Sequence, residues 1–130
     1  MAVFPMISFA QQIYIGANTS MSLSDRDGSN ASAAYATVIN DGTLDITGTD
    51  TGTSLQSLFG SGTVLMDGRV LILTSADGFY QGTLLGSGGL VIAGGYETLG
   101  GQSFHAGATT VDWYAGLALS GSGSIAMSSG

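Results

Sequence analysis

Short apolar runs alternate with Gly-rich corners along residues 38–130 of this chain. The runs are rich in aliphatic and β-branched residues and end at Gly, Asp or Asn, which is typical of short strands joined by tight turns. No stretch of 11 or more residues carries the i, i+3, i+4 stripe of an amphipathic helix without an interrupting Gly. We therefore predict an all-β fold, with strands at Thr43–Thr47, Thr63–Met66, Val70–Thr74, Leu90–Ile92, Thr109–Trp113 and Gly116–Ser120.

One group of residues recurs together with its surroundings. Gly60–Met66 returns further along the chain as Gly86–Ile92, and Phe79–Gly82 returns at nearly the same offset as Phe104–Gly107. A unit of this length holds two or three short strands, and it cannot bury its apolar face without a neighbouring unit. The recurrence predicts a right-handed parallel β-helix (solenoid) of short strands and Gly-rich corners, with a period of about 25–26 residues. In this arrangement Phe79 stacks on Phe104.

The chain divides into three segments. Residues 1–12 are apolar, and Ser8-Phe9-Ala10 resembles a small-x-small cleavage site, so this segment is either the truncated end of a signal peptide or a first strand. Residues 13–37 form a polar N-terminal segment in which Asp25–Asn30 reads as a turn. Residues 38–130 hold the solenoid repeats. Because the sequence stops early in a new repeat, with no helix or charged edge to close it, we expect a fragment of a longer protein.

The composition fits a regular stack. Charged residues make up 8% of the chain, against roughly a quarter in an ordinary globular domain. Equivalent residues of successive coils lie about 4.8 Å apart in a solenoid, so a charge at a repeated position would face its own copy and destabilise the sheet. Gly, Ser, Thr and Asn replace the missing charges here, and these neutral residues stack without repulsion.

The charge and the missing residue types exclude several functions. The net charge of −7 argues against nucleic acid and anionic lipid as partners, since both require clustered Lys and Arg. The absence of Cys excludes a disulfide framework and Cys-based metal sites. No run of 18 or more apolar residues is present to form a spanning helix.

A further set of motifs recurs from Ala31 onward: a strand, a Gly-x-Gly corner, a second strand with alternating Thr, and a Gly-x-Thr-Thr-Val step into the next repeat. These motifs lie at Asn40–Gly48, Leu58–Val64, Leu71–Thr74, Gly86–Leu90, Gly107–Val111 and Leu117–Ile125. On them, about three-quarters of the chain resembles the passenger-associated repeats of bacterial autotransporters.

The resemblance implies a non-catalytic, secreted or cell-surface β-solenoid that serves as a structural stalk or adhesin passenger. Such a passenger would be exported through an outer-membrane translocator barrel in the parent chain, and it would contribute to virulence by contacting a host-surface protein or glycan. The alternative is a carbohydrate-binding or carbohydrate-cleaving β-helix of the pectate-lyase or tailspike kind.

Several aromatic residues stand where the family repeats usually place outward Thr or Ser. If they point outward, they form a surface for stacking sugars or anchoring a protein. If they point inward, they fill the core or stack between coils. Both interpretations stay open for Phe79, Tyr80, Tyr96, Phe104, Trp113 and Tyr114.

The sequence predicts no catalytic residue, cofactor or metal site. His105 is the only His, and no Gly-x-Ser-x-Gly elbow presents a nucleophile to it, so we expect it at an exposed loop position like that of Tyr80. The acids fall mostly in Asp-Gly turns rather than in carboxylate pairs. Asp25–Asn30 lacks the sixth-position Gly and twelfth-position Glu of a calcium loop.

Overall fold

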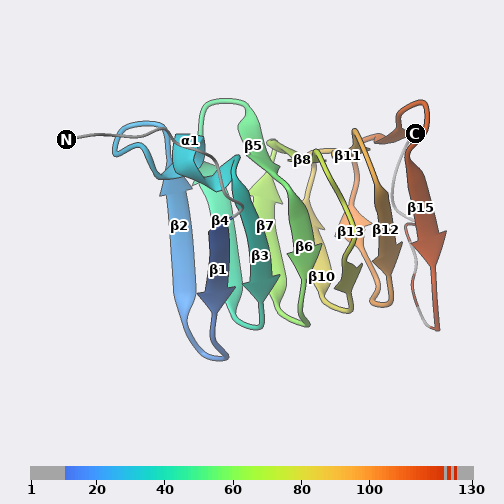
Figure 1. Ribbon diagram of the computed structural model, residues 1–130. Coiled ribbons are helices and arrows are strands. Elements are labelled where there is room, and N and C mark those ends of the chain that lie inside the picture. The colour runs from blue at the N-terminus through green and yellow to red at the C-terminus, as the bar shows by residue number, and fades with distance from the viewer. Residues whose placement is uncertain (1–10, 122, 124, 126–130) are drawn as a thin grey trace.

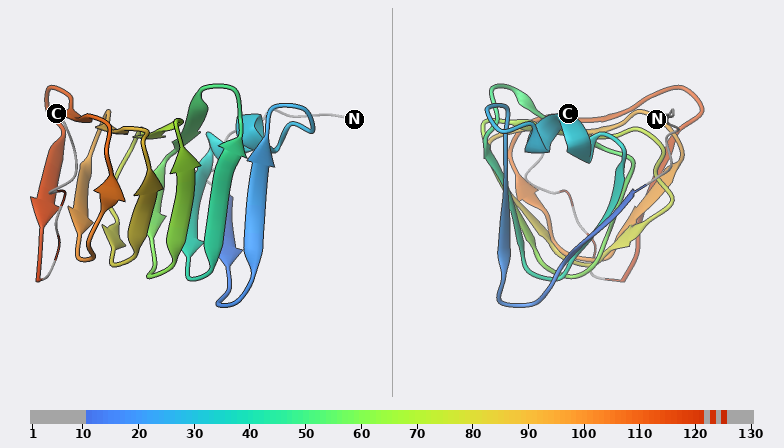
Figure 2. Two further views of the ribbon diagram at one scale, coloured as in Figure 1. Left: turned by 180° about the vertical axis from the view of Figure 1, so that it is seen from behind. Right: turned by 60° about the vertical axis from the view of Figure 1, so that its left-hand side comes forward.

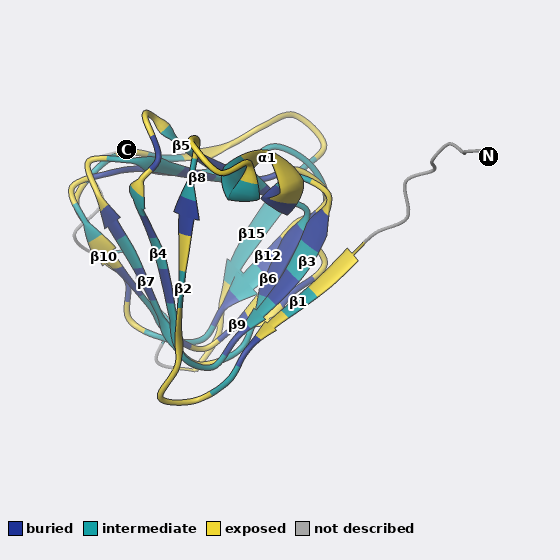
Figure 3. Ribbon diagram, turned by 90° about the vertical axis from the view of Figure 1, so that its left-hand side faces the viewer, coloured by how far each residue is buried: buried dark blue, intermediate teal, exposed yellow. Residues whose placement is uncertain are grey.

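The chain winds into a right-handed parallel β-solenoid of about five turns in the computed structural model, which describes residues 11–121, 123 and 125. Its cross-section is triangular, with one strand of each regular coil on each of three faces (Figures 1 and 2). Seen from the N-terminal end, the chain turns clockwise as it recedes (Figure 3), which makes the winding right-handed. The predicted all-β solenoid is confirmed.

The three faces collect strands from successive coils. The first face consists of β1 (Gln11–Ile15), β3 (Ala36–Asn40), β6 (Ser57–Phe59), β9 (Phe79–Tyr80), β12 (Tyr96–Leu99) and β15 (Gly116–Leu119). The second consists of β2 (Ser20–Ser24), β4 (Thr43–Gly48), β7 (Thr63–Asp67), β10 (Thr83–Gly86) and β13 (Phe104–His105). The third consists of β5 (Gly52–Leu55), β8 (Val70–Leu73), β11 (Leu90–Ile92) and β14 (Thr109–Val111). In the first coil the short helix α1 (Ser29–Ala33) precedes β3 and contacts β5.

The coil length differs from the prediction. Thr43 pairs with Thr63, and Thr63 pairs with Thr83, so the coils that hold them are shorter than the predicted period. A longer step, close to that period, occurs in the first coil, where Gln11 pairs with Ala36. The predicted period is wrong for the later coils because it linked two different corners of the triangle.

The corner after Gly60 joins the first face to the second, whereas the corner after Gly86 joins the second face to the third. Both are Gly-Ser-Gly corners, so local similarity hid the difference in position. The predicted stack of Phe79 on Phe104 is wrong for the same reason. Phe79 pairs with Thr98 on the first face, and Phe104 pairs with Leu85 on the second.

The solenoid also begins earlier than residue 38. β1 and β2 pair in parallel with β3 and β4, so the polar segment 13–37 belongs to the first coil. Within it, Asp25–Gly28 bends the chain as predicted, and Ser29 begins the unpredicted helix α1. Of the predicted signal-peptide end or first strand, Gln11 and Gln12 open β1, and the rest lies outside the described residues.

The core consists of inward side chains stacked coil upon coil. Along strands such as β3, β4, β7 and β8, buried residues alternate with partly or fully exposed ones (Figure 3), as the period of two requires. One column runs Leu44, Val64, Leu84 on the second face. Each fully buried aliphatic side chain contributes about 1.5–3 kcal/mol, so the columns supply the main stabilisation of the stack.

At some glycines, the corners of successive coils lie so close together that no side chain would fit between them. Gly60 has φ +111°, and a Cβ there would lie 2.2 Å from the Asn40 carbonyl oxygen of the coil before. Gly28 also has a positive φ, of +81°, but its Cβ would meet nothing within 4 Å. Substitution at Gly28 therefore tests the effect of backbone strain alone, whereas substitution at Gly60 tests strain together with the close contact between coils.

We expect Gly60→Ala to lower the free energy of unfolding by about 3 kcal/mol or more, because it adds a backbone clash to left-handed strain. Gly28→Ala, the matched control, should cost only about 1 kcal/mol of strain. Urea unfolding of both variants measures the difference, and equal losses would show that coil contact at Gly60 does not matter.

Candidate functional site

The structure separates the six aromatic candidates. Tyr80 is fully buried in the core, so its assignment as a surface-contact residue is wrong. Five others are exposed rather than packed in the core: Phe79, Tyr96, Phe104, Trp113 and Tyr114. They do not form one patch, because Phe104 lies on the second face and Phe79 on the first. Their role in contacts stays a prediction.

Large outward side chains follow the solenoid axis on the first face. Tyr14 pairs with Ile39, and Ile39 pairs with Phe59. The bridge between Gly60 and Tyr80 places Phe59 beside Phe79 in the next coil. We call Tyr14, Ile39, Phe59 and Phe79 the axial stripe. Three of its four members escaped the sequence analysis, since only the coil register aligns them.

The corner between the third and first faces projects aromatic side chains at β14–β15. Trp113 and Tyr114 are 86% and 99% exposed, and their ring centroids lie 6.4 Å apart at 54°. They occupy the two middle positions of a turn closed by the Ala115 N–H, which donates to the Asp112 carbonyl at 3.0 Å.

This turn is longer and more strained than its counterpart one coil earlier. Four residues separate the paired positions of β14 and β15, against three between β11 and β12. The earlier turn has Gly95 at φ +77°, whereas the later one has Tyr114 at +67°, a conformation that bulky residues rarely adopt. Tyr96 follows the earlier turn, and its ring covers Gly116 just after the later one. We call Tyr96, Trp113 and Tyr114 the aromatic corner.

His105 is buried, so its predicted exposed loop position is wrong. Its Nδ1 lies 2.9 Å from Ser103 Oγ, and its Nε2 lies 2.7 Å from Thr109 Oγ1. Burial lowers the pKa of His105, which favours the neutral ring. A catalytic triad needs a third group that stabilises the imidazolium, and a threonine hydroxyl carries no charge with which to do so. The arrangement is that of an internal hydrogen-bonded group.

Asn40 and Tyr80 form a second buried polar contact. Asn40 Nδ2 donates to Tyr80 Oη at 3.2 Å and to the Thr63 carbonyl at 2.9 Å. Tyr80 Oη donates to the Gly62 carbonyl at 2.7 Å. Burial raises the pKa of Tyr80, so the phenol stays protonated. The pair joins strands β3 and β9, which lie two coils apart.

Glu97 is the third buried polar group. Its Oε1 accepts hydrogen bonds from the Gly78 N–H at 3.3 Å and from Ser57 Oγ at 3.5 Å. Its Oε2 has no hydrogen-bond partner among the described residues. Burial raises the pKa of Glu97 to about 8, against the lowering effect of these hydrogen bonds. The carboxyl group is therefore mostly protonated at neutral pH.

These three buried residues share one sequence signal. Tyr80 stands opposite Gly60, Glu97 is next to Gly78, and His105 pairs with Gly86. At each of these glycines an added Cβ would meet the coil before it: Asn40 at Gly60, Leu58 at Gly78 and Asp67 at Gly86. This signal is readable in the sequence only when the coil length is known.

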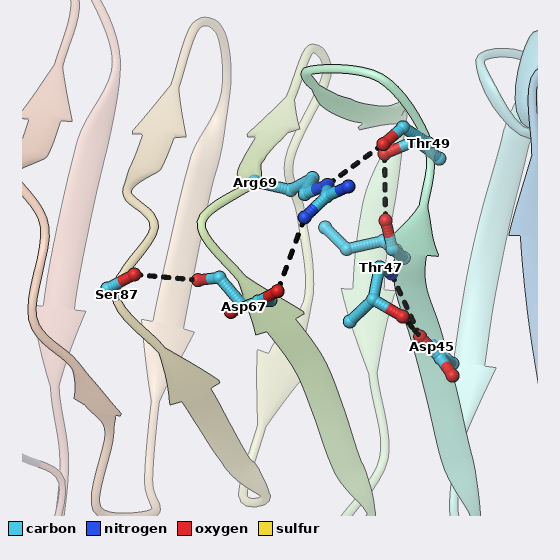
Figure 4. A network of polar contacts seen from close by, with 7 residues as sticks. Asp45, Thr47, Thr49, Asp67, Arg69 and Ser87 are labelled. Atoms are coloured by element: carbon cyan, nitrogen blue, oxygen red, sulfur yellow. Dashed lines mark hydrogen bonds and ion pairs between the residues drawn. The ribbon is translucent and has the colours of Figure 1, made fainter.

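The outer corner between the second and third faces carries a polar network (Figure 4). Arg69 Nε donates to the Thr49 carbonyl at 2.8 Å, and its guanidinium lies 3.3 Å from Asp67. Asp45 accepts hydrogen bonds from the backbone and hydroxyl of Thr47. One of the two basic residues in the chain thus ties neighbouring coils together at their surface.

The Asp25–Asn30 turn makes structural contacts with the next coil. Asn30 Nδ2 donates to Asp25 at 2.6 Å and to the Gly52 carbonyl at 3.1 Å, and Asn30 Oδ1 accepts from Thr53 Oγ1. The hydrogen bonds from Asn30 and from the Asp50 N–H lower the pKa of Asp25. Across the described part of the chain, no group of three or more His, Cys, Asp or Glu residues could hold a metal ion.

A shallow hollow of about 330 Å³ lies on the third face at β5 and β8. Its lining combines hydroxyl and aliphatic groups from Thr51, Gly52, Thr53, Ser54, Val70 and Ile72. The hollow carries no charged or titratable side chain, so it has the chemistry for weak polar contacts.

Comparison with known proteins adds no relative: no family model, curated protein or solved structure matches the chain. Within residues 11–121, 123 and 125, no helix is long and apolar enough to cross a membrane.

We expect the stability of the protein to fall as pH rises from about 4.5 to 8. In this range the unfolded chain releases the Glu97 proton, whereas the folded chain, with its pKa of about 8, retains it. The free energy of unfolding should therefore drop by about 1.4 kcal/mol per pH unit from this group. Chemical unfolding across this range measures the slope, and Glu97→Gln should remove the contribution. An unchanged slope in the variant would contradict the assignment.

Proposed function

We propose that this chain is a non-catalytic structural segment of a longer β-solenoid, which acts as a stalk or adhesin and makes contacts through outward aromatic side chains. One observation carries the proposal: buried polar groups that could perform chemistry instead join coils. The Asn40–Tyr80 and Ser57–Glu97 hydrogen bonds each connect residues 40 positions apart. These contacts stiffen the stack, which is what a stalk requires.

The proposed setting is the passenger of a bacterial autotransporter, secreted or displayed on the cell surface. The motifs of the resemblance support this setting, since Gly107–Val111 forms the step into β14 and Asn40–Gly48 forms the corner before β4 and the strand itself. The proposed partners are the outer-membrane translocator barrel of the parent chain and a host-surface protein or glycan.

The aromatic corner is the proposed contact surface. The preceding coil makes the corresponding turn with one residue fewer and with Gly94 and Gly95, so a turn at this corner does not require two aromatic residues. Exposed aromatic rings are unfavourable in water and are enriched where proteins bind partners. A strained tyrosine in a turn that glycine would satisfy suggests selection for contact rather than for stability.

Binding of the purified chain to cultured animal-cell surfaces tests the proposal. We expect Trp113→Ala combined with Tyr114→Gly to weaken binding by about tenfold or more, as for central aromatic contacts elsewhere. The variant should fold normally because both side chains are exposed and glycine suits the backbone at position 114. Tyr14→Ala, at the other end of the molecule, is the matched control. No binding by the unaltered chain, or equal binding by the variant, would contradict an adhesive role.

The parent coding sequence tests the autotransporter setting independently. A downstream region of about a dozen amphipathic strands of roughly ten residues is the pattern of a membrane barrel. Its presence would support export of this kind, and its absence from the full reading frame would rule that export route out.

The axial stripe favours a second candidate, a carbohydrate-binding solenoid. Sugar rings stack on aromatic faces, and the stripe places Tyr14, Phe59 and Phe79 along one line. We expect retention on insoluble polysaccharide to be lost in Tyr14→Ala combined with Phe79→Ala and to persist in the Trp113 and Tyr114 variant. The reverse pattern would assign the contacts to the aromatic corner.

A further inference from the structure

The first face is divided, whereas the other two are continuous. The second face is one five-stranded sheet and the third is one four-stranded sheet. The first face consists of two three-stranded sheets, β1-β3-β6 and β9-β12-β15. Among the described residues, the pair Gly60 and Tyr80 forms the one backbone bridge between them. We call this boundary between β6 and β9 the seam.

Side chains replace the missing backbone ladder at the seam. The Asp77 N–H donates to Ser57 Oγ at 2.9 Å, and the Gly78 N–H donates to Glu97 Oε1 at 3.3 Å. Ser57 Oγ also lies 3.5 Å from Glu97 Oε1. Two successive backbone donors just before β9 are therefore satisfied by one residue from the coil before and one from the coil after.

The backbone on the two sides of the seam approaches closely because Gly78 has no side chain. A Cβ at Gly78 would lie 2.1 Å from the Leu58 carbonyl oxygen and 2.9 Å from Ser57 Oγ. Glu97 is fully buried, and its Oε2 finds no partner in the described part of the chain. A buried carboxylate in such a place is costly unless a cation accompanies it.

The groups around Glu97 supply no cation. Asp77, the charged residue that acts on it, is itself an acid and disfavours a second negative charge. Ser57 and Leu58 on β6 and Leu117 on β15 are uncharged. Arg69 is bound at another corner to Thr49 and Asp67, and the buried His105 lies on the second face. Arg26 lies in the exposed turn of the first coil.

We propose that the seam is a proton-operated joint. After the Glu97 proton is lost, the buried carboxylate moves toward water; its departure removes the acceptor of the Gly78 N–H and the partner of Ser57, and lets the first face part between β6 and β9. The continuous second and third faces keep the coils together, so the solenoid bends at the seam rather than unfolds. Burial places the Glu97 pKa at about 8, so the joint opens in the mildly alkaline range. This joint does not depend on the proposed adhesive role.

Amide hydrogen exchange of the whole chain at pH 6 and pH 9, corrected for intrinsic rates, tests the joint. We expect protection of Asp77, Gly78 and Phe79 to fall by about tenfold more than that of Val64 on the second face and Leu71 on the third. In Glu97→Gln, an isosteric and uncharged variant, this extra loss should disappear.

The unaltered protein decides the matter even if the variant folds poorly. Equal loss of protection on all three faces would mean cooperative unfolding, and it would overturn the joint. Unchanged protection at the seam would overturn it too, as would an extra loss that persists in Glu97→Gln. Ser57→Ala, which removes the other seam contact, should increase exchange at Asp77 at both pH values, because a serine hydroxyl does not titrate in this range.

Discussion

Each residue of this chain must fit its own counterparts in the coils before and after it, about 4.8 Å away in a parallel ladder. This requirement governs the composition, the placement of many glycines and the contacts of several buried polar groups. Charges are rare because stacked copies would repel. The cations that the chain does carry lie at corners, where Arg69 can reach Asp67 and the carbonyl of a neighbouring coil. The hydroxyls of Thr43, Thr63 and Thr83 show the neutral alternative, stacked in register on one face.

Large polar residues enter the core under the same constraint. A side chain that exceeds the volume of its layer must extend into the adjacent coil, and Tyr80 and Glu97 each stand beside a glycine of the coil before. Tyr80 and Glu97 both extend across such a glycine and bond with residues two coils away. Packing and hydrogen bonding are thus coupled over distances that a single coil does not span. The coils are consequently held together both by contacts between adjacent coils and by hydrogen bonds between coils that are not adjacent.

Local information was sufficient to predict the strands but not their alignment. The apolar runs at Thr63–Met66, Val70–Thr74 and Leu90–Ile92 became β7, β8 and β11 because the pattern of each is contained within a few residues. The coil period, the burial of His105 and the axial stripe all depend on which residues stack, and two similar Gly-Ser-Gly corners concealed that register. Had the shorter coil length been known, the sequence would have predicted that Gly86 pairs with His105 and that Ile39 pairs with Phe59. The unusual exposure of Trp113 and Tyr114 follows from one additional turn residue, which stacking alone does not predict.

The helix α1 covers one edge of the third face. Strand β5 is the first of the third face, and its outer backbone would invite a foreign strand to pair with it. The helix lies against it instead, and the Asn30 amide occupies the Gly52 carbonyl. The β5 edge of the third face is therefore not available for a further strand to pair with. A covered edge of this kind protects the sheet from pairing with strands of other molecules, the first step of growth into amyloid-like aggregates.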